Sequence, residues 1–257
     1  MKIVILCGGF GTRLREETEF RPKPLVDIGG KPILWHVMKL FSAHKLNDFV
    51  LCLGYRGDMI KEYFLNYETS NSDLTVDLRK SQAIVYNSRH KERFRVTMVD
   101  TGLETLTGGR IKRASKYLDG ERFMVTYGDG LADVDLKQLN IFHNMHGRSA
   151  TVTVTRPFSR FGLVSVDREG RATRFEEKPQ IEGWTSAGFF VFEKAVLDYI
   201  QGDNSVLEKD VLPRIAAEGK LSAFKHEGFF YAMDTYREYK YLNDLWNGGN
   251  APWKVWK

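Results

Sequence analysis

The chain is long enough to bury a sizeable core, and its composition is that of an ordinary globular enzyme. It has 257 residues, of which 42% are hydrophobic and 28% are charged. Its 38 Lys and Arg residues outnumber its 33 Asp and Glu residues, which gives a formal net charge of +5. Because the basic residues are scattered, this mild excess argues against a nucleic-acid groove and favours a small anionic substrate.

Cys7 and Cys52 are the only two cysteines, and each lies in or just after an apolar stretch. Two cysteines are too few for a disulfide scaffold, and their spacing fits no thiolate metal site, so we expect buried free thiols. The first residues already read as a strand, and no stretch reaches the length of a membrane-spanning helix. We therefore expect a cytoplasmic protein with no signal peptide and no membrane partner.

The chain opens with a strand that runs directly into a glycine-rich loop. Residues 3–6 form an unbroken apolar run, as expected of a central parallel strand covered on both faces. Gly8, Gly9 and Gly11 have no Cβ, so the backbone N–H groups can approach an anion closely. Arg13 adds a planar, permanently charged group suited to phosphate oxygens. The pattern predicts a phosphate-binding loop, and a structural strand-to-helix turn is the alternative.

A charged segment, residues 15–27, follows this loop. Pro22 and Pro24 exclude a helix interior there, and they flank Lys23. A backbone stiffened on both sides would help to aim the lysine charge at a phosphate. The alternative is a solvated surface lysine.

Alternating helices and strands come next. Gly29 and Gly30 precede a helix with one apolar face, residues 49–53 form a second buried strand, and residues 58–67 form another helix. Strands and helices at this spacing indicate right-handed parallel crossovers in a doubly wound sheet.

Two stretches are expected to lie at the periphery of this sheet. Residues of about 70–100 form short strand-like stretches separated by polar residues. They predict a pair of strands inserted at an edge of the sheet. Residues of about 235–257 comprise a helix and a tail that carries Trp253 and Trp256. Exposed tryptophans are unfavourable, so the tail should dock on its own domain or on a neighbouring subunit. Without repeats or an evident linker, residues 1–257 are expected to form a single domain.

Two later segments combine glycine with charge. Gly108 and Gly109 stand before Arg110 and permit close backbone approach to a ligand, although an ordinary turn explains them equally well. The strand of residues 123–127 ends in a glycine-bracketed aspartate, Asp129. Ligands bind outside the carboxyl ends of strands in open parallel sheets, so Asp129 is well placed to hold a divalent cation.

The alternative role for Asp129 is to cap the next helix, but Asp133 and Asp135 are closer to that helix.

The remaining elements are a helix at 136–146, a strand at 150–155, a hairpin of 163–166 with 173–175, a strand at 189–192, a helix from 195, a helix at 207–218 and a last helix at 236–246.

The order of these motifs resembles the signature of the sugar-phosphate nucleotidyltransferases. The resemblance is carried by the run from Gly8 to Leu14, followed by Pro22-Lys23-Pro24, and it extends to Asp129, Glu177-Lys178-Pro179 and Asp234. It covers almost the whole chain and implies an α/β, doubly wound, mostly parallel, Rossmann-like sheet with peripheral strands and helices. It also implies transfer of a nucleotidyl group to a sugar 1-phosphate with release of pyrophosphate, Mg²⁺ as cofactor, and a homo-oligomer.

The resemblance also assigns residues to roles. Arg13 would neutralise the departing pyrophosphate and Lys23 would bridge the phosphates, which makes these two the expected catalytic residues. Asp129 and Asp234 would hold Mg²⁺. The nucleotide would contact Leu6, Cys7, Gly8, Gly9, Gly11, Thr12, Arg13, Lys23, Thr107, Gly108, Gly109, Arg110 and Gly128, and the sugar phosphate would contact Tyr127, Glu177, Lys178, Ser186 and Gly188.

Within the family, the segments 107–110, 127–130 and 233–235 resemble the subgroup that uses CTP and glucose 1-phosphate to make CDP-glucose. The chain departs from that subgroup at Ser186-Ala187-Gly188, where Asn-Gly-Gly is expected, and at Glu104 in the segment expected to approach the base. A phosphorylated acceptor other than glucose 1-phosphate therefore remains an alternative, because a site built to hydrogen-bond one particular hydroxyl discriminates strongly against substrates that lack it.

Two further alternatives are a homologue that uses dTTP or UTP and a non-catalytic module that only senses nucleotides. The sensor is disfavoured because five charged residues expected to act in the reaction are present together: Arg13, Lys23, Asp129, Lys178 and Asp234.

Overall fold

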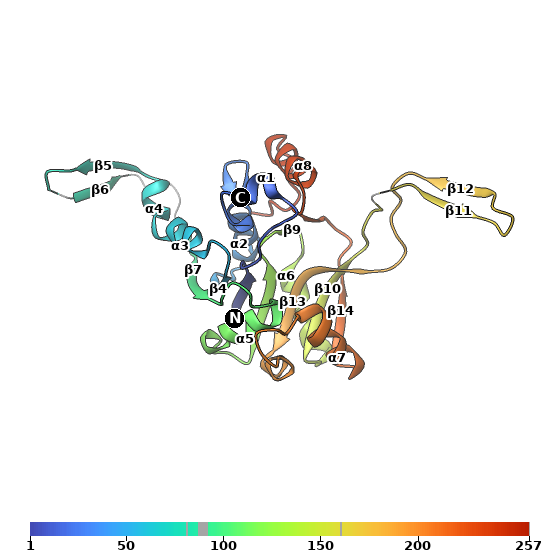
Figure 1. The fold of residues 1–257 in the computed structure, drawn as a ribbon. Helices are drawn as coiled ribbons and strands as arrows, with labels where there is room; N and C mark the ends of the chain where they lie inside the picture. Colours follow the sequence, from blue (N-terminus) through green and yellow to red (C-terminus); the bar gives the residue numbers. More distant parts are fainter. Residues whose placement is uncertain (81, 87–91, 160, 257) are drawn as a thin grey trace.

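The computed structural model describes residues 1–80, 82–86, 92–159 and 161–256. Within them, a central sheet has the strand order β14-β10-β13-β8-β1-β4-β7 (Figure 1). Strand β13 is antiparallel to both of its neighbours, whereas the other pairings in this sheet are parallel. The strands of this sheet are β1 (Lys2–Leu6), β4 (Asp48–Leu53), β7 (Arg95–Asp100), β8 (Arg122–Tyr127), β10 (Ala150–Thr155), β13 (Thr185–Glu193) and β14 (Leu221–Lys225).

The apolar run of β1 lies at the centre of the sheet, as predicted. Ile3, Val4 and Ile5 are fully buried, and β1 pairs in parallel with β4 on one side and with β8 on the other. Ile3 and Ile5 pack in a core under helices α2 (Ile33–Ala43) and α6 (Leu136–His146). Val4 faces the opposite core, which includes residues of α5 (Thr107–Ala114) and α7 (Leu212–Ala217). The chain is therefore a doubly wound α/β protein.

Most of the predicted helices are present with small differences in their bounds. Asp135 caps α6 as expected, because its carboxylate accepts hydrogen bonds from the backbone N–H groups of Lys137 and Gln138. The remaining helices and short strands are α1 (Arg15–Thr18), η1 (Lys23–Leu25), β2 (Asp27–Ile28), β3 (Lys31–Pro32), α3 (Gly57–Leu65), α4 (Tyr67–Ser70), η2 (Ser115–Tyr117), β9 (Gly130–Ala132), β15 (Phe230–Ala232) and α8 (Tyr236–Asn247).

Two predicted α-helices are not regular α-helices over their whole length. The helix expected from residue 195 is a 3₁₀ segment, η3 (Lys194–Tyr199). The helix expected at 207–218 is divided into a π-helical turn, η4 (Leu207–Val211), and α7. Pro213 lies in the first turn of α7, and because proline has no N–H group, a single regular helix cannot run through this position.

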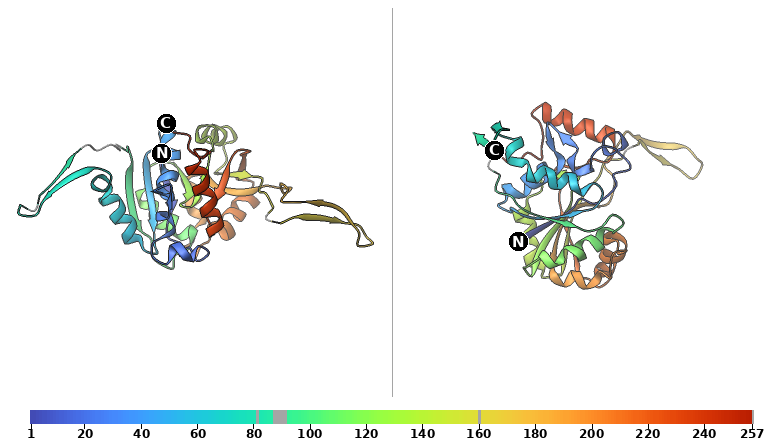
Figure 2. Two further views of the ribbon diagram at one scale, coloured as in Figure 1. Left: turned by 90° about the horizontal axis from the view of Figure 1, so that it is seen from above. Right: turned by 60° about the vertical axis from the view of Figure 1, so that its left-hand side comes forward.

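Two β-hairpins project from opposite sides of the sheet (Figure 2). One hairpin arm pairs β5 (Asp73–Asp77) with β6 (Gln82–Tyr86), and the other pairs β11 (Leu163–Val166) with β12 (Ala172–Glu176). Strand β7, which lies within the predicted insertion at 70–100, joins the central sheet as an edge strand. The second hairpin exposes apolar side chains, among them Val164, Val166 and Phe175.

The carboxyl-terminal tail docks on its own domain, one of the two predicted outcomes. Trp253 is fully buried, and its Nε1–H donates a hydrogen bond to Nδ1 of His36 on α2, 3.3 Å away. Trp256 packs edge-on against Trp35, which also lies on α2.

No helix in the described ranges is both long and apolar enough to cross a membrane. Cys7 and Cys52 are buried and free, as expected.

Candidate active site

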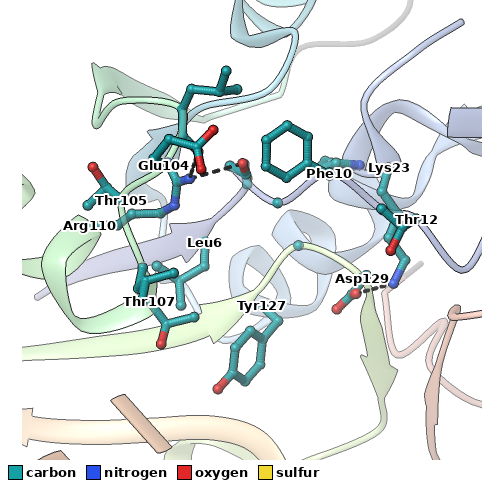
Figure 3. A pocket seen from close by; sticks show the side chains of 18 of the residues that line it. Leu6, Phe10, Thr12, Lys23, Glu104, Thr105, Thr107, Arg110, Tyr127 and Asp129 are labelled. Atoms are coloured by element: carbon teal, nitrogen blue, oxygen red, sulfur yellow. Dashed lines mark hydrogen bonds and ion pairs between the residues drawn. The ribbon is translucent and has the colours of Figure 1, made fainter. Parts of the chain in front are cut away.

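The carboxyl ends of β1 and β8 open into a cleft of about 390 Å³. The register places Leu6 beside Tyr127, so the glycine loop and the segment that contains Asp129 leave the sheet side by side. Figure 3 shows Thr107 and Arg110 toward one end of the cleft and Lys23 and Asp129 toward the other. The predicted nucleotide contacts that line this cleft are Leu6, Cys7, Gly8, Gly9, Gly11, Thr12, Arg13, Lys23, Thr107, Arg110 and Gly128.

The loop geometry requires glycine at two positions. Gly11 has a φ of +65°, in the left-handed region that favours glycine. A Cβ on Gly8 would lie 2.1 Å from Nη1 of Arg110, so any side chain there would displace the guanidinium. The loop therefore depends on close packing against Arg110.

Arg110, expected to contact the base or ribose, lines the cleft, and its guanidinium is largely buried among backbone carbonyl groups. It is only 5% exposed, and its Nη2 donates to the carbonyl oxygens of Gly8 and Leu103 at 3.1 and 3.0 Å. Its Nη1 donates to the carbonyl oxygens of Leu53 and Gly102 and to Thr101 Oγ1, at 3.0, 2.7 and 2.8 Å. The guanidinium thus joins the glycine loop to the 101–103 segment under the cleft. Burial lowers the pKa of Arg110.

Gly108 and Gly109, also expected to contact the nucleotide, are not among the residues that line the cleft. Both backbone N–H groups donate to the carbonyl oxygen of Ser205, at 2.9 and 3.2 Å. A Cβ on Gly109 would lie 2.5 Å from the carbonyl oxygen of Asp203. These glycines let the first turn of α5 pack tightly on the 203–205 loop.

Four charged side chains converge beside the glycine loop. Lys23 Nζ donates to Asp129 Oδ2 at 2.5 Å and to Asp234 Oδ1 at 2.8 Å, and Arg13 Nη2 lies 2.8 Å from Asp234 Oδ1. The Lys23 side chain is only 11% exposed. Burial opposes its charge, but the two carboxylates outweigh burial and raise the pKa of Lys23 above its ordinary value.

The two carboxylates suit a divalent cation. They come from separate elements, since Asp129 follows β8 and Asp234 follows β15, yet both reach the same ammonium group. Hard oxygen ligands of this kind are those that Mg²⁺ prefers. No cluster of three or more His, Cys, Asp or Glu side chains that would hold a metal is found among residues 1–80, 82–86, 92–159 and 161–256. Further ligands would come from phosphate and water.

The predicted sugar-phosphate contacts are divided among several places. Tyr127 lines the cleft and also a small adjoining pocket of about 70 Å³, together with Ser186 and Gly188. Lys178 lines a larger cavity of about 600 Å³ that also includes Asp234. Glu177 lines none of these spaces, and its carboxylate lies 3.1 Å from Lys178 Nζ.

The backbone is unusual at two of these positions. Lys178 has a φ of +48°, which is uncommon for a residue with a side chain and is often found at functional sites. Gly188 has a φ of +75°, and a Cβ there would lie 2.5 Å from Cδ2 of Tyr127. The Tyr127 ring therefore packs directly over Gly188.

Sequence patterns do not point to several residues of the site. Glu208 accepts hydrogen bonds from Tyr127 and Thr107, although no motif contains it. Burial and the Glu208 carboxylate raise the pKa of Tyr127, so its hydroxyl stays protonated and can donate. Other residues that line the cleft are Phe10, Pro24, Leu103, Glu104, Thr105 and Leu106, of which Leu103, Thr105 and Leu106 belong to no motif that the sequence indicates.

Comparison with known proteins identifies the family. The sequence profile described as Nucleotidyl transferase matches residues 2–247. The chain belongs to the nucleotidyl transferase family. This nucleotidyltransferase is 49% identical to the glucose-1-phosphate cytidylyltransferase of Salmonella typhimurium and 45% identical to the probable glucose-1-phosphate cytidylyltransferase of Bacillus subtilis. Each alignment covers 100% of both chains.

Solved structures support the fold of this nucleotidyltransferase. HddC from Yersinia pseudotuberculosis has a TM-score of 0.71 and 24% identity, with 95% of this chain and 99% of HddC covered. An apo UDP-glucose pyrophosphorylase has a TM-score of 0.70 and 15% identity, with 96% and 98% covered. At these identities the likeness concerns the fold, and it agrees with the predicted Rossmann-like α/β sheet.

Proposed function

We propose that this nucleotidyltransferase joins CTP and glucose 1-phosphate to form CDP-glucose and pyrophosphate. The observation that carries the proposal is the convergence of Lys23, Asp129, Asp234 and Arg13 beside the glycine loop. The choice of CTP and glucose 1-phosphate is supported by the full-length likeness to proteins named glucose-1-phosphate cytidylyltransferase.

In the proposed reaction, a phosphate oxygen of the sugar 1-phosphate attacks the α-phosphorus of CTP. The new P–O bond forms as the bond between the α-phosphorus and the bridging oxygen to the β-phosphorus breaks, and pyrophosphate leaves with that electron pair. The attacking phosphate is already ionised at neutral pH, so the step needs no protein base. The protein must align the reactants and neutralise charge.

The chain's own charges fit these requirements. The backbone of the glycine loop would hold the triphosphate, Arg13 would neutralise the leaving pyrophosphate, and Lys23 would contact phosphate oxygens. Asp129 and Asp234 would hold Mg²⁺, which when bound would add positive charge beside the phosphates.

We place the acceptor in the 600 Å³ cavity and the adjoining small pocket. The small pocket of Ser186 and Gly188 has room for only a few water molecules, whereas the cavity of Lys178 also reaches Asp234. Phe230 lines both spaces, so they are neighbours. Cations at the cavity wall, including Arg156 and Arg237, suit a phosphorylated ligand.

The direct test supplies the protein with Mg²⁺, each nucleoside triphosphate in turn and glucose 1-phosphate, and follows pyrophosphate. We expect the highest kcat/KM with CTP. If CTP reacts with another phosphorylated sugar but not with glucose 1-phosphate, the acceptor is different, and Ser186 in place of the expected asparagine would account for the change. Nucleotide binding without pyrophosphate release from any acceptor would favour a sensor and overturn the proposal.

We also propose that the chain forms a homo-oligomer through the β11–β12 hairpin arm. The β11–β12 arm places Val164 opposite Phe175 and Val166 opposite Ala172, so exposed apolar side chains lie along it. A second copy of the chain that packs on this arm would bury these apolar side chains away from water. Light scattering should give a mass above that of one chain, and V164D/F175D should lower that mass. A wild-type monomer would contradict the proposal.

A further inference from the structure

Glu208 binds two side chains that line the cleft. It lies in the π-helical turn η4, and its Oε1 accepts a hydrogen bond from the Tyr127 hydroxyl. Its Oε2 accepts a hydrogen bond from Thr107 Oγ1 at 2.8 Å. The Thr107 Oγ1 accepts in turn from the backbone N–H of Leu207 at 2.9 Å. One carboxylate therefore ties the end of β8 and the start of α5 to the same turn.

Tyr127 stands where the nucleotide side and the acceptor side of the site meet. Its ring lines the cleft together with Thr107, and it also lines the small pocket of Ser186 and Gly188. The ring packs on the Cα of Gly188 at one side, while its hydroxyl is held by Glu208. The position of the ring between the two spaces thus depends on this carboxylate.

We propose that Glu208 is a positioning residue for nucleotidyl transfer, which fixes the Tyr127 ring between the nucleotide and acceptor spaces and the Thr107 hydroxyl at the nucleotide side. The proposal rests on the proposed function. A carboxylate has two oxygens, so Glu208 can accept from both hydroxyls at once and orient them relative to each other. A displacement of about 1 Å in groups that orient the reactants costs on the order of a hundredfold in rate.

The first test compares variants of Glu208 by steady-state kinetics. Glu208→Ala removes both hydrogen bonds, and we expect kcat to fall about a hundredfold. Glu208→Gln keeps one carbonyl oxygen, so it can accept from only one of the two hydroxyls in the present geometry, and its kcat should fall about tenfold. Wild-type kcat in Glu208→Ala would overturn the proposal.

A matched control is available on another surface. Glu218 also accepts a hydrogen bond from a tyrosine hydroxyl, that of Tyr199, but it does not line the cleft. Glu218→Ala should therefore keep the wild-type kcat. An equal loss of kcat in both variants would trace the effect to general destabilisation and contradict positioning.

A second test separates positioning from direct contact with substrate. In a protein that already carries Y127F and T107V, the hydroxyls through which Glu208 acts are gone, so adding E208A should cause no further loss of kcat. An undiminished loss in that background would mean that Glu208 acts on the substrate itself, and the proposal would be wrong.

A structural readout keeps the proposal testable apart from activity. Crystal structures of the full chain should show the Tyr127 ring and the Thr107 side chain displaced in E208A and unchanged in E218A. If the wild-type protein releases no pyrophosphate from any substrate pair, the proposed function fails, and these structures still decide whether Glu208 holds the two residues. An unmoved Tyr127 in E208A would refute the positioning role.

Discussion

Asp129 and Asp234 share one ammonium group, although they follow different strands and are more than a hundred residues apart in the chain. Asparagine at either position would keep the side-chain shape but remove the charge. We expect D129N and D234N to lower kcat at least about a hundredfold, because electrostatic stabilisation of the phosphates would be lost. The measurement is pyrophosphate release under saturating substrates, with circular dichroism to check the fold.

A suitable control for these variants is Asp119, whose carboxylate lies 3.3 Å from Lys2 Nζ at an exposed position. D119N should keep normal turnover, since exposed ion pairs contribute little. Near-normal turnover in D129N or D234N would remove the metal assignment.

Arg110 illustrates how a residue can line a ligand site and yet serve the fold. R110M would remove the guanidinium donor from the carbonyl oxygens of Gly102 and Leu103. The carbonyl oxygens of Gly8 and Leu53 would lose one hydrogen bond each but keep those from the backbone N–H groups of Tyr55 and Thr101. We expect the free energy of unfolding to fall by about 3 kcal/mol or more. Denaturant unfolding would measure this change. A normal free energy of unfolding combined with weaker nucleotide binding would instead support a direct contact with the base.

The residue types of the site were predictable, but several of their roles were not. The sequence shows that Lys23 is flanked by prolines and that Gly108 and Gly109 are adjacent. It does not show that the two glycines face the 203–205 loop, because that loop is about a hundred residues away. Glu208 carried no signal at all, since its role comes entirely from tertiary contacts with Tyr127 and Thr107.

Helix α2 and the carboxyl-terminal tail are joined at His36, which is fully buried. Its Nε2 donates to the carbonyl oxygen of Ile28 at 2.8 Å, and its Nδ1 accepts from Trp253, an arrangement that requires the neutral ring. Burial lowers the pKa of His36 to about 4. In the unfolded chain, the same ring takes up a proton at about pH 6.5.

Between pH 6.5 and about 4, the unfolded state therefore binds more protons at His36 than the folded state does. Stability should fall as the pH falls through this window, and His36 should contribute up to about 3 kcal/mol of the loss. Urea unfolding across this range, in wild type and H36Q, measures the contribution. Burial also lowers the pKa of His143 and His146, which therefore contribute to the pH dependence of both proteins. The contribution of His36 is the difference between wild type and H36Q in how the free energy of unfolding changes with pH. Equal slopes would contradict this role for His36.

At the scale of elements, hydrophobic patterning predicted most strands and helices, because their apolar faces are continuous in the sequence. The strand β1 is the clearest case, with three consecutive fully buried residues, Ile3, Val4 and Ile5. The pattern failed at 207–218, where Pro213 interrupts the helix while the apolar spacing continues. The projection of the two hairpin arms could not be predicted either, since strand patterns do not say which sheet a strand will join.

At the scale of the whole molecule, the order of strands explains where the site lies. Strands β4 and β7 extend the sheet on one side of β1, and β8 extends it on the other. Ligands in open α/β sheets bind at the carboxyl ends of strands where the order reverses. The loop after β1 and Asp129 after β8 meet at this point, while η1 and the segment after β15 bring in Lys23 and Asp234.

A nucleotide bound there would contact segments from distant parts of the chain and should stabilise all of them together. With CTP and Mg²⁺ at about one hundred times the dissociation constant, the gain is about 2.7 kcal/mol. For a chain of this size that corresponds to a rise in Tm of about 5–10 °C. Differential scanning calorimetry measures the shift.

The Tm shifts caused by different ligands show how much each end of the cleft contributes to binding. The glycine loop and Lys23 meet phosphates, whereas the 103–107 segment lies at the end where the base is expected. Inorganic triphosphate with Mg²⁺ should therefore give only part of the shift at equal concentration, and UTP should give less than CTP. If inorganic triphosphate matched CTP, the 103–107 segment would contribute nothing to binding, and the specificity for CTP would have to arise during catalysis.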